Sequence, residues 1–121
     1  MKTKNVRVRV KDLKQGVTIY IAHPAYGIEE AVVVTRPYVS HFTGYLLFDV
    51  YTKYGYNSES VGDAGITSGD SYNYRRTFFK RKHAEEWVNK MATDKGFLKN
   101  QAQNKAWNDM FDDLIEDEWE I

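Results

Sequence analysis

The sequence predicts an α+β domain, in which a five-stranded antiparallel sheet or small barrel is followed by two C-terminal helices packed on it. Three observations support this class. Short β-rich runs fill residues 1–79, turn residues separate these runs, and the apolar residues take a helical period from Lys80 onward. We therefore expect residues 1–121 to form a single domain, with a β part (1–79) and a helical part (80–121).

The first two predicted strands lie on either side of a short turn. In residues 6–11 three valines alternate with basic residues, the period of two that is typical of a strand with one buried face. Residues 12–16 (DLKQG) have turn chemistry, because Gly tolerates a positive φ. Residues 17–22 (VTIYIA) form the next β-rich run. We expect the two strands to pair.

Three further strands are predicted. Residues 28–36 form one run, which ends where Pro37 lacks a backbone donor. Residues 45–51 (YLLFDVY) form the fourth strand and residues 72–79 (YNYRRTFF) the fifth. Between these two, residues 53–71 contain several glycines and little periodicity, which predicts a long loop that is either mobile or functional.

The helical part begins at Lys80. A stripe of apolar residues at helical spacing predicts the first helix, with residues 93–96 (TDKG) as its stop. This stripe consists of Ala84, Trp87, Val88 and Met91. A second helical pattern runs from Phe97 to about Trp119, with a candidate break near residues 104–108.

Two segments resemble known families. The strand count and the turn-into-strand DLKQGVTIYI resemble small five-stranded barrels of the Tudor and KOW kind over residues 5–79. The segment RRTFFKRKHAEEWVNKM, a strand that leads directly into a basic amphipathic helix, resembles small accessory proteins of tailed bacteriophages. The second resemblance implies a phage-encoded protein that acts in the host cytoplasm.

Composition narrows the function classes. The chain has no Cys, so we expect a reducing compartment and neither disulfides nor a thiolate metal site. It also lacks the run of about 18–20 apolar residues that would span a bilayer, so we expect a cytoplasmic protein and no membrane partner. The formal net charge of zero conceals an imbalance, because all 17 Lys and Arg precede residue 109 and seven of the 17 Asp and Glu follow residue 108.

No motif predicts an enzyme. His23, His41 and His83 lie in different elements and lack the spacing of a zinc site. The nucleophile motif G-x-S-x-G is absent, and the loop sequence DAGITSGD does not fit the calcium-binding pattern. We therefore expect no catalytic site, no metal and no cofactor.

The acidic C-terminus, DMFDDLIEDEWEI, predicts a helix that needs a partner surface. Six apolar residues fall on one helical stripe, namely Trp107, Met110, Phe111, Leu114, Ile115 and Trp119. Four like-charged i,i+4 pairs oppose the helix by about 1–2 kcal/mol in total, whereas burial of each large apolar side chain contributes about 1.5–3 kcal/mol. The stripe must therefore dock on the protein's own sheet, on a second copy in a homo-oligomer, or on another protein.

Residues 72–82 combine aromatic rings with cations, the chemistry of single-strand nucleic-acid binding. Rings stack on bases, while Lys and Arg neutralise phosphates. The alternative is that these aromatic residues pack beneath the helices, and the pI of about 6.8 is far below that of typical nucleic-acid-binding domains.

Two main functional hypotheses follow, beside a third in which an unrecognised site in the 53–71 loop makes the protein an enzyme. The first is a non-enzymatic protein-binding module, in phage context one that inhibits or redirects a host factor. Its contact residues would be Asp109, Asp112, Asp113, Glu116, Asp117, Glu118 and Glu120, with Trp119 as an apolar anchor. The alternative is a nucleic-acid-binding module modulated by the acidic terminus, with contacts from Tyr72, Tyr74, Arg75, Arg76, Lys80, Arg81 and Lys82.

Overall fold

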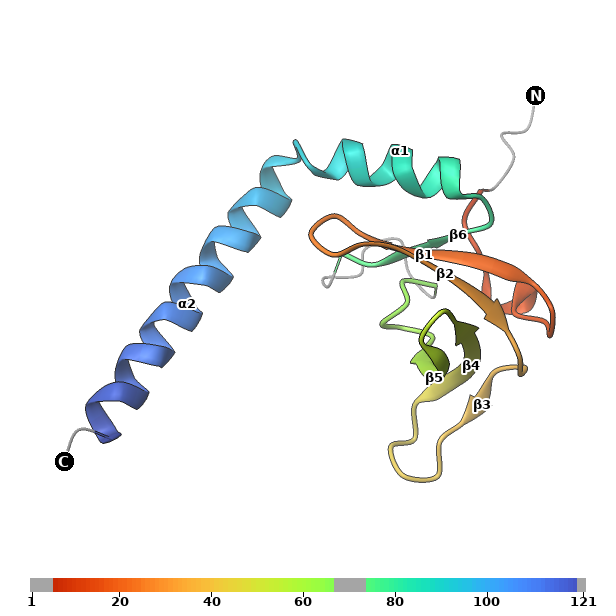
Figure 1. The fold of residues 1–121 in the computed structure, drawn as a ribbon, viewed down its shortest axis with the longest axis horizontal. Helices are drawn as coiled ribbons and strands as arrows, with labels where there is room; N and C mark the ends of the chain where they lie inside the picture. Colours follow the sequence, from red (N-terminus) through yellow and green to blue (C-terminus); the bar gives the residue numbers. More distant parts are fainter. Residues whose placement is uncertain (1–5, 67–73, 120–121) are drawn as a thin grey trace. The chain divides into compact units, whose positions relative to one another are not determined.

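The protein has the predicted α+β architecture, an antiparallel sheet followed by two helices (Figure 1). The computed structural model describes residues 6–66 and 74–119, except for the side chains of 104, 108 and 111–119. In this part of the chain the sheet has six strands rather than five. They are β1 (Thr18–His23), β2 (Gly27–Val33), β3 (Tyr38–Val39), β4 (Leu46–Thr52), β5 (Gly55–Ser60) and β6 (Arg76–Phe78).

The sheet encloses the main core. Its strand order is β3-β4-β2-β1-β6, and β5 pairs with the other side of β4. Alternate residues of β1 and β4, such as Ile19 and Phe48, point into the core because successive side chains of a strand face opposite ways. Buried residues from outside the strands complete this core: Val8, Leu13, Val61, Ala64 and Ile66.

The first helix, α1 (Arg81–Met91), covers the opposite face of β1 and β6, as Figure 1 shows. Buried Ala84 of α1 belongs to a second apolar cluster with Ala22 and Phe78, against which Trp87 packs. The rings of Phe78 and Trp87 have centroids 6.1 Å apart. The prediction of helix packing on the sheet is therefore confirmed for α1, and β1 has apolar neighbours on both faces.

The predicted first strand is wrong. Arg7 forms one isolated bridge to Phe78, and the chain then turns into a short 3-10 helix, η1 (Val10–Asp12). The carboxylate of Asp12 accepts a hydrogen bond from the backbone N–H of Arg9 at 3.0 Å, which stabilises the turn. The expected pairing with residues 17–22 is also absent, because β2 and β6 occupy the two edges of β1.

The region between β4 and β6 also differs from the prediction. β5 lies inside residues 53–71, which the sequence predicts to be a loop. The last predicted strand, 72–79, is reduced to β6, and part of it lies outside the described residues. Between β5 and β6, Gly65 has a φ of +72°, and a Cβ there would overlap the carbonyl oxygen of Arg75. Only glycine fits this close approach.

The second helix, α2 (Lys95–Trp119), is continuous, so the candidate break near residues 104–108 is wrong. It begins at a capped turn, since the N–H of Phe97 donates to Oδ1 of Asp94 at 2.9 Å. The chain divides into two compact units, Met1–Asn89 and Lys90–Ile121. α1 belongs almost entirely to the first unit, whereas the sequence pattern grouped it with the second helix.

Candidate functional site

The segment predicted for nucleic-acid binding is divided between the interior and the surface. Arg76 is only 9% exposed; its Nη1 donates to the carbonyl of Arg75 at 2.8 Å, and its guanidinium lies 5.7 Å from the ring centroid of Trp87. Phe78 is buried in the same cluster. These two side chains therefore pack beneath α1, as the alternative interpretation of the segment expected.

Other members of the segment are accessible. Lys80, Arg81 and Lys82 are exposed, and the guanidinium of Arg81 lies 5.5 Å from the ring centroid of Tyr20. Tyr74 is half-buried with a left-handed backbone (φ 60°), while Tyr72 lies outside the described residues. The structure thus brings three cations to the start of α1, and their role in nucleic-acid binding stays a prediction.

Arg75 forms a partly buried ion pair with Glu59 of β5. Its Nη1 donates to Oε2 of Glu59 at 3.3 Å, and the amide of Asn57 donates to Oε1 at 3.3 Å. Burial raises the pKa of the Glu59 carboxyl above its ordinary value, and the charge of Arg75 opposes this rise. The neighbouring carboxylates of Glu29 and Asp63 raise the pKa further.

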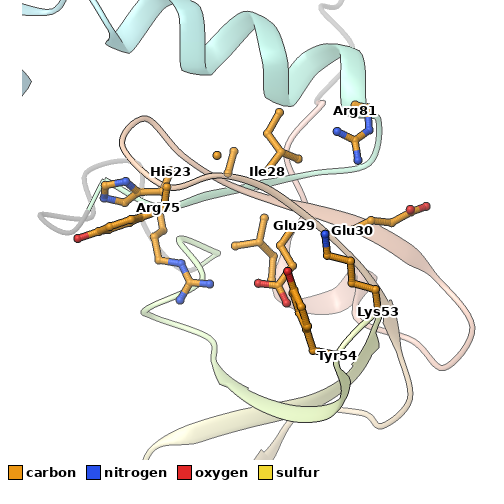
Figure 2. Close-up of a pocket in the computed structure, with 12 residues that line it drawn as sticks. His23, Ile28, Glu29, Glu30, Lys53, Tyr54, Arg75 and Arg81 are labelled. Atoms are coloured by element: carbon orange, nitrogen blue, oxygen red, sulfur yellow. The ribbon is translucent and has the colours of Figure 1, made fainter.

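An open pocket of about 680 Å³ lies between the β1–β2 turn and the β4–β5 turn (Figure 2). In Figure 2, Arg75 lies on one side of the pocket, Lys53 and Tyr54 lie on the other, and Glu29 lies between them. The pocket is lined by Ile21, Ala22, His23, Tyr26, Gly27, Ile28, Glu29, Glu30, Lys53, Tyr54, Arg75 and Arg81. Its charged groups are of both signs.

The histidine of the pocket serves the local turn. Nδ1 of His23 accepts the N–H of Ala25 at 3.0 Å, and the imidazole lies against the ring of Tyr26 with centroids 4.6 Å apart. In the described part of the chain, no group of three or more His, Asp or Glu side chains is arranged to hold a metal ion. The pocket itself offers charged side chains of both signs and the rings of Tyr26 and Tyr54.

A second surface, here called the tyrosine face, covers the outer side of β3, β4 and β5. Its residues are Tyr38, Leu47, Asp49, Tyr51, Tyr56 and Ser58, which the strand registers place on one side of the sheet. The intervening residues of β4, Phe48 and Val50, are fully buried. The rings of Tyr51 and Tyr56 contact each other, with centroids 4.9 Å apart, and both are exposed.

The acidic terminus coincides with the second half of α2. Its backbone is helical through Trp119, which confirms the helix on which the apolar stripe was predicted. Asp109 is exposed, and Trp107 and Met110 are 59% and 49% exposed. The side chains of the remaining predicted contact residues, together with Glu120, lie outside the described ones: Asp112, Asp113, Glu116, Asp117, Glu118 and Trp119.

Sequence reasoning missed both the pocket and the tyrosine face, because each is assembled by strand pairing. One local signal was present for the second. The two residues between Thr52 and Gly55 form a tight hairpin turn, in which Gly55 has a φ of +107° and Oγ1 of Thr52 accepts the N–H of Tyr54 at 3.1 Å. Such a turn after a clear strand predicts a returning partner, and so a second line of residues beside Tyr51.

Comparison with known proteins identifies the family. A family model described as Phage g100-like protein matches residues 7–91, which include the whole sheet and α1. The chain therefore belongs to the Phage g100-like protein family, and its resemblance to phage proteins is confirmed. The resemblance to Tudor and KOW barrels is not confirmed. Neither the curated proteins nor the solved structures gave a significant match. Within the described residues, no helix is both long and apolar enough to cross a membrane.

Proposed function

We propose that this phage g100-like protein is a non-enzymatic accessory protein that binds a protein of the host and inhibits or redirects it. The contact is made by the acidic, amphipathic second half of α2. The observation that carries the proposal is the exposure of Trp107 and Met110 on a helix whose following residues are rich in carboxylates. Large exposed apolar side chains with charged neighbours are typical of interaction sites.

The energetics favour a docked helix. Burial of a large apolar side chain contributes about 1.5–3 kcal/mol, so two or three such contacts exceed the charge repulsion within the helix. Trp119 is the proposed anchor, since Trp is enriched among the residues that dominate binding energy. The family model matches residues 7–91, so the proposed contact lies outside the matched part of the chain.

The charge of α2 indicates the chemistry of the partner. Seven carboxylates and no basic group occur in residues 109–121, so the complementary surface is cationic. Proteins that bind nucleic acid carry such surfaces, because much of their affinity comes from phosphate contacts. A dense line of carboxylates can bind the same cationic surface in place of the phosphates. We propose that α2 imitates a nucleic acid in this way and competes with it for the partner.

Affinity capture from a lysate of host cells tests the proposal. The bait is the full-length protein, compared with the variant D112N/D113N and with the matched control E85Q/E86Q, which removes two adjacent exposed carboxylates from α1. Neutralisation of Asp112 and Asp113 relieves repulsion in α2, so a loss of binding cannot result from a weakened helix.

We expect a protein that the wild type and the control retain and that D112N/D113N loses, with or without nuclease treatment. Retention of the same proteins by all three baits would contradict the role of α2. Capture that disappears on nuclease treatment would instead support the nucleic-acid hypothesis, with Lys80, Arg81 and Lys82 as the exposed contacts.

A further inference from the structure

The tyrosine face contains the carboxylate of Asp49, in which one oxygen accepts two hydrogen bonds from neighbouring side chains. The hydroxyls of Tyr38 and Ser58 both donate to Oδ1 of Asp49, at 2.6 Å and 2.7 Å. The other carboxylate oxygen, Oδ2, accepts no hydrogen bond from the residues that the structure describes, and no Lys or Arg among them pairs with it. The carboxylate therefore keeps one oriented oxygen for an external donor.

Two tyrosines form the next cross-strand pair beside Asp49 on the same side of the sheet. Asp49 is paired with Ser58, and the neighbouring pair on the same side of the sheet is Tyr51 and Tyr56. Successive same-side pairs are about 7 Å apart, a spacing that one planar cation can bridge. Tyr51 and Tyr56 are 50% and 79% exposed and their rings make a tilted contact, so ring surface outside this contact remains accessible.

The combination selects a cation. The face of an aromatic ring attracts positive charge, and the free oxygen of Asp49 accepts a charge-assisted hydrogen bond. The protein already forms such contacts within its own chain, since Nζ of Lys53 lies 5.0 Å from the ring centroid of Tyr54. A guanidinium fits better than an ammonium, because its plane stacks on a ring while its edge donates to a carboxylate.

We propose that the tyrosine face binds an arginine side chain presented by a protein partner. The guanidinium pairs with Oδ2 of Asp49 and stacks against the rings of Tyr51 and Tyr56. This inference goes beyond the proposed function of α2, because it places a separate contact on the sheet and does not require the helix to bind. Both surfaces are complementary to a basic protein.

An NMR titration of the full-length protein with N-acetyl-argininamide tests the proposal without a known partner. The matched probe is N-acetyl-citrullinamide, which has the same shape and lacks the charge. We expect saturable chemical-shift changes at Asp49, Tyr51, Tyr56 and Ser58 with the arginine probe and much smaller changes with the citrulline probe. Changes confined to α2, or equal changes with both probes, would overturn the proposal.

Two variants separate the chemistry from the fold. In D49N, the amide oxygen can still accept the hydroxyls of Tyr38 and Ser58, so only the anionic oxygen is lost, and we expect about fivefold weaker binding of the arginine probe. Y56L keeps apolar volume but removes one ring, and we expect a smaller loss. The control E86Q removes an exposed carboxylate of α1 and leaves binding unchanged. Unchanged affinity in D49N would also refute the proposal, whatever the outcome for α2.

Discussion

The large apolar side chains of β4 and of α2 differ in what covers them. Phe48 is fully buried in the core that the sheet encloses, whereas Trp107 of α2 is more than half exposed. Both residues belong to regular apolar patterns, one with the period of a strand and one with the period of a helix. The difference teaches that a pattern shows which face of an element needs cover, but not whether the same chain supplies that cover.

The largest effect is expected when one aromatic side chain of each region is truncated to alanine. We expect Phe48→Ala to lower the free energy of unfolding by about 3–5 kcal/mol, because it removes buried contacts and leaves a cavity. Trp107→Ala should lower it by less than about 1 kcal/mol, since the exposed ring loses little on truncation. Urea unfolding of both variants measures the two values. Equal losses would show that Trp107 is as important to the stability of the free protein as the sheet core.

A smaller effect tests the packing that closes the core between β5 and β6. Gly65→Ala places a Cβ against the carbonyl of Arg75 and strains a left-handed residue, so we expect a loss of about 2–4 kcal/mol. Gly44→Ala is the matched control, because Gly44 has a similar φ of +74° and no atom near its Cβ position. Its loss should be about 1–2 kcal/mol, from backbone strain alone. Thermal or urea unfolding that ranks the two variants equally would contradict the close approach at Gly65.

The smallest expected effect concerns Glu59, the buried carboxylate of β5 that pairs with Arg75. Because the pKa of Glu59 is raised in the folded state, the folded protein holds the proton more tightly than the unfolded chain. The stability gained from protonation is present below the ordinary value of 4.5 and is lost as the pH rises through the higher folded pKa. Glu59→Gln should therefore flatten the fall in stability as the pH rises from about 4.5. An identical pH profile for the variant and the wild type would contradict the role of burial.

The parts of the fold that the sequence predicts correctly are those with a local pattern. The alternation in β4 and the stripe of α1 each place apolar residues on one face, and both elements are found where expected. Residues 6–10 show the same alternation but do not form a regular strand, because Asp12 stabilises a turn and the neighbouring edges of β1 are occupied. Local alternation cannot report which edge of a sheet is available.

The elements that were missed depend on partners distant in the sequence. Residues 55–60 (GYNSES) have little apolar character, and they form a strand because β4 supplies their hydrogen bonds. In the same way, the Arg75–Glu59 ion pair and the burial of Arg76 beneath Trp87 follow from the topology. The sequence shows a cluster of arginines at residues 75, 76 and 81. It does not show that Arg76 is buried for structural reasons whereas Arg81 is exposed.

Site-specific photo-crosslinking tests the central claim, that α2 binds a host protein, most directly. A benzoylphenylalanine is introduced in place of Met110 on α2, and the reference position is Phe42, an exposed ring in the β3–β4 turn. In a host lysate we predict a covalent adduct with one protein from position 110, little or none from position 42, and a reduced yield when D112N/D113N is combined with the label. No protein adduct from position 110, or a yield that D112N/D113N leaves unchanged, would contradict the account.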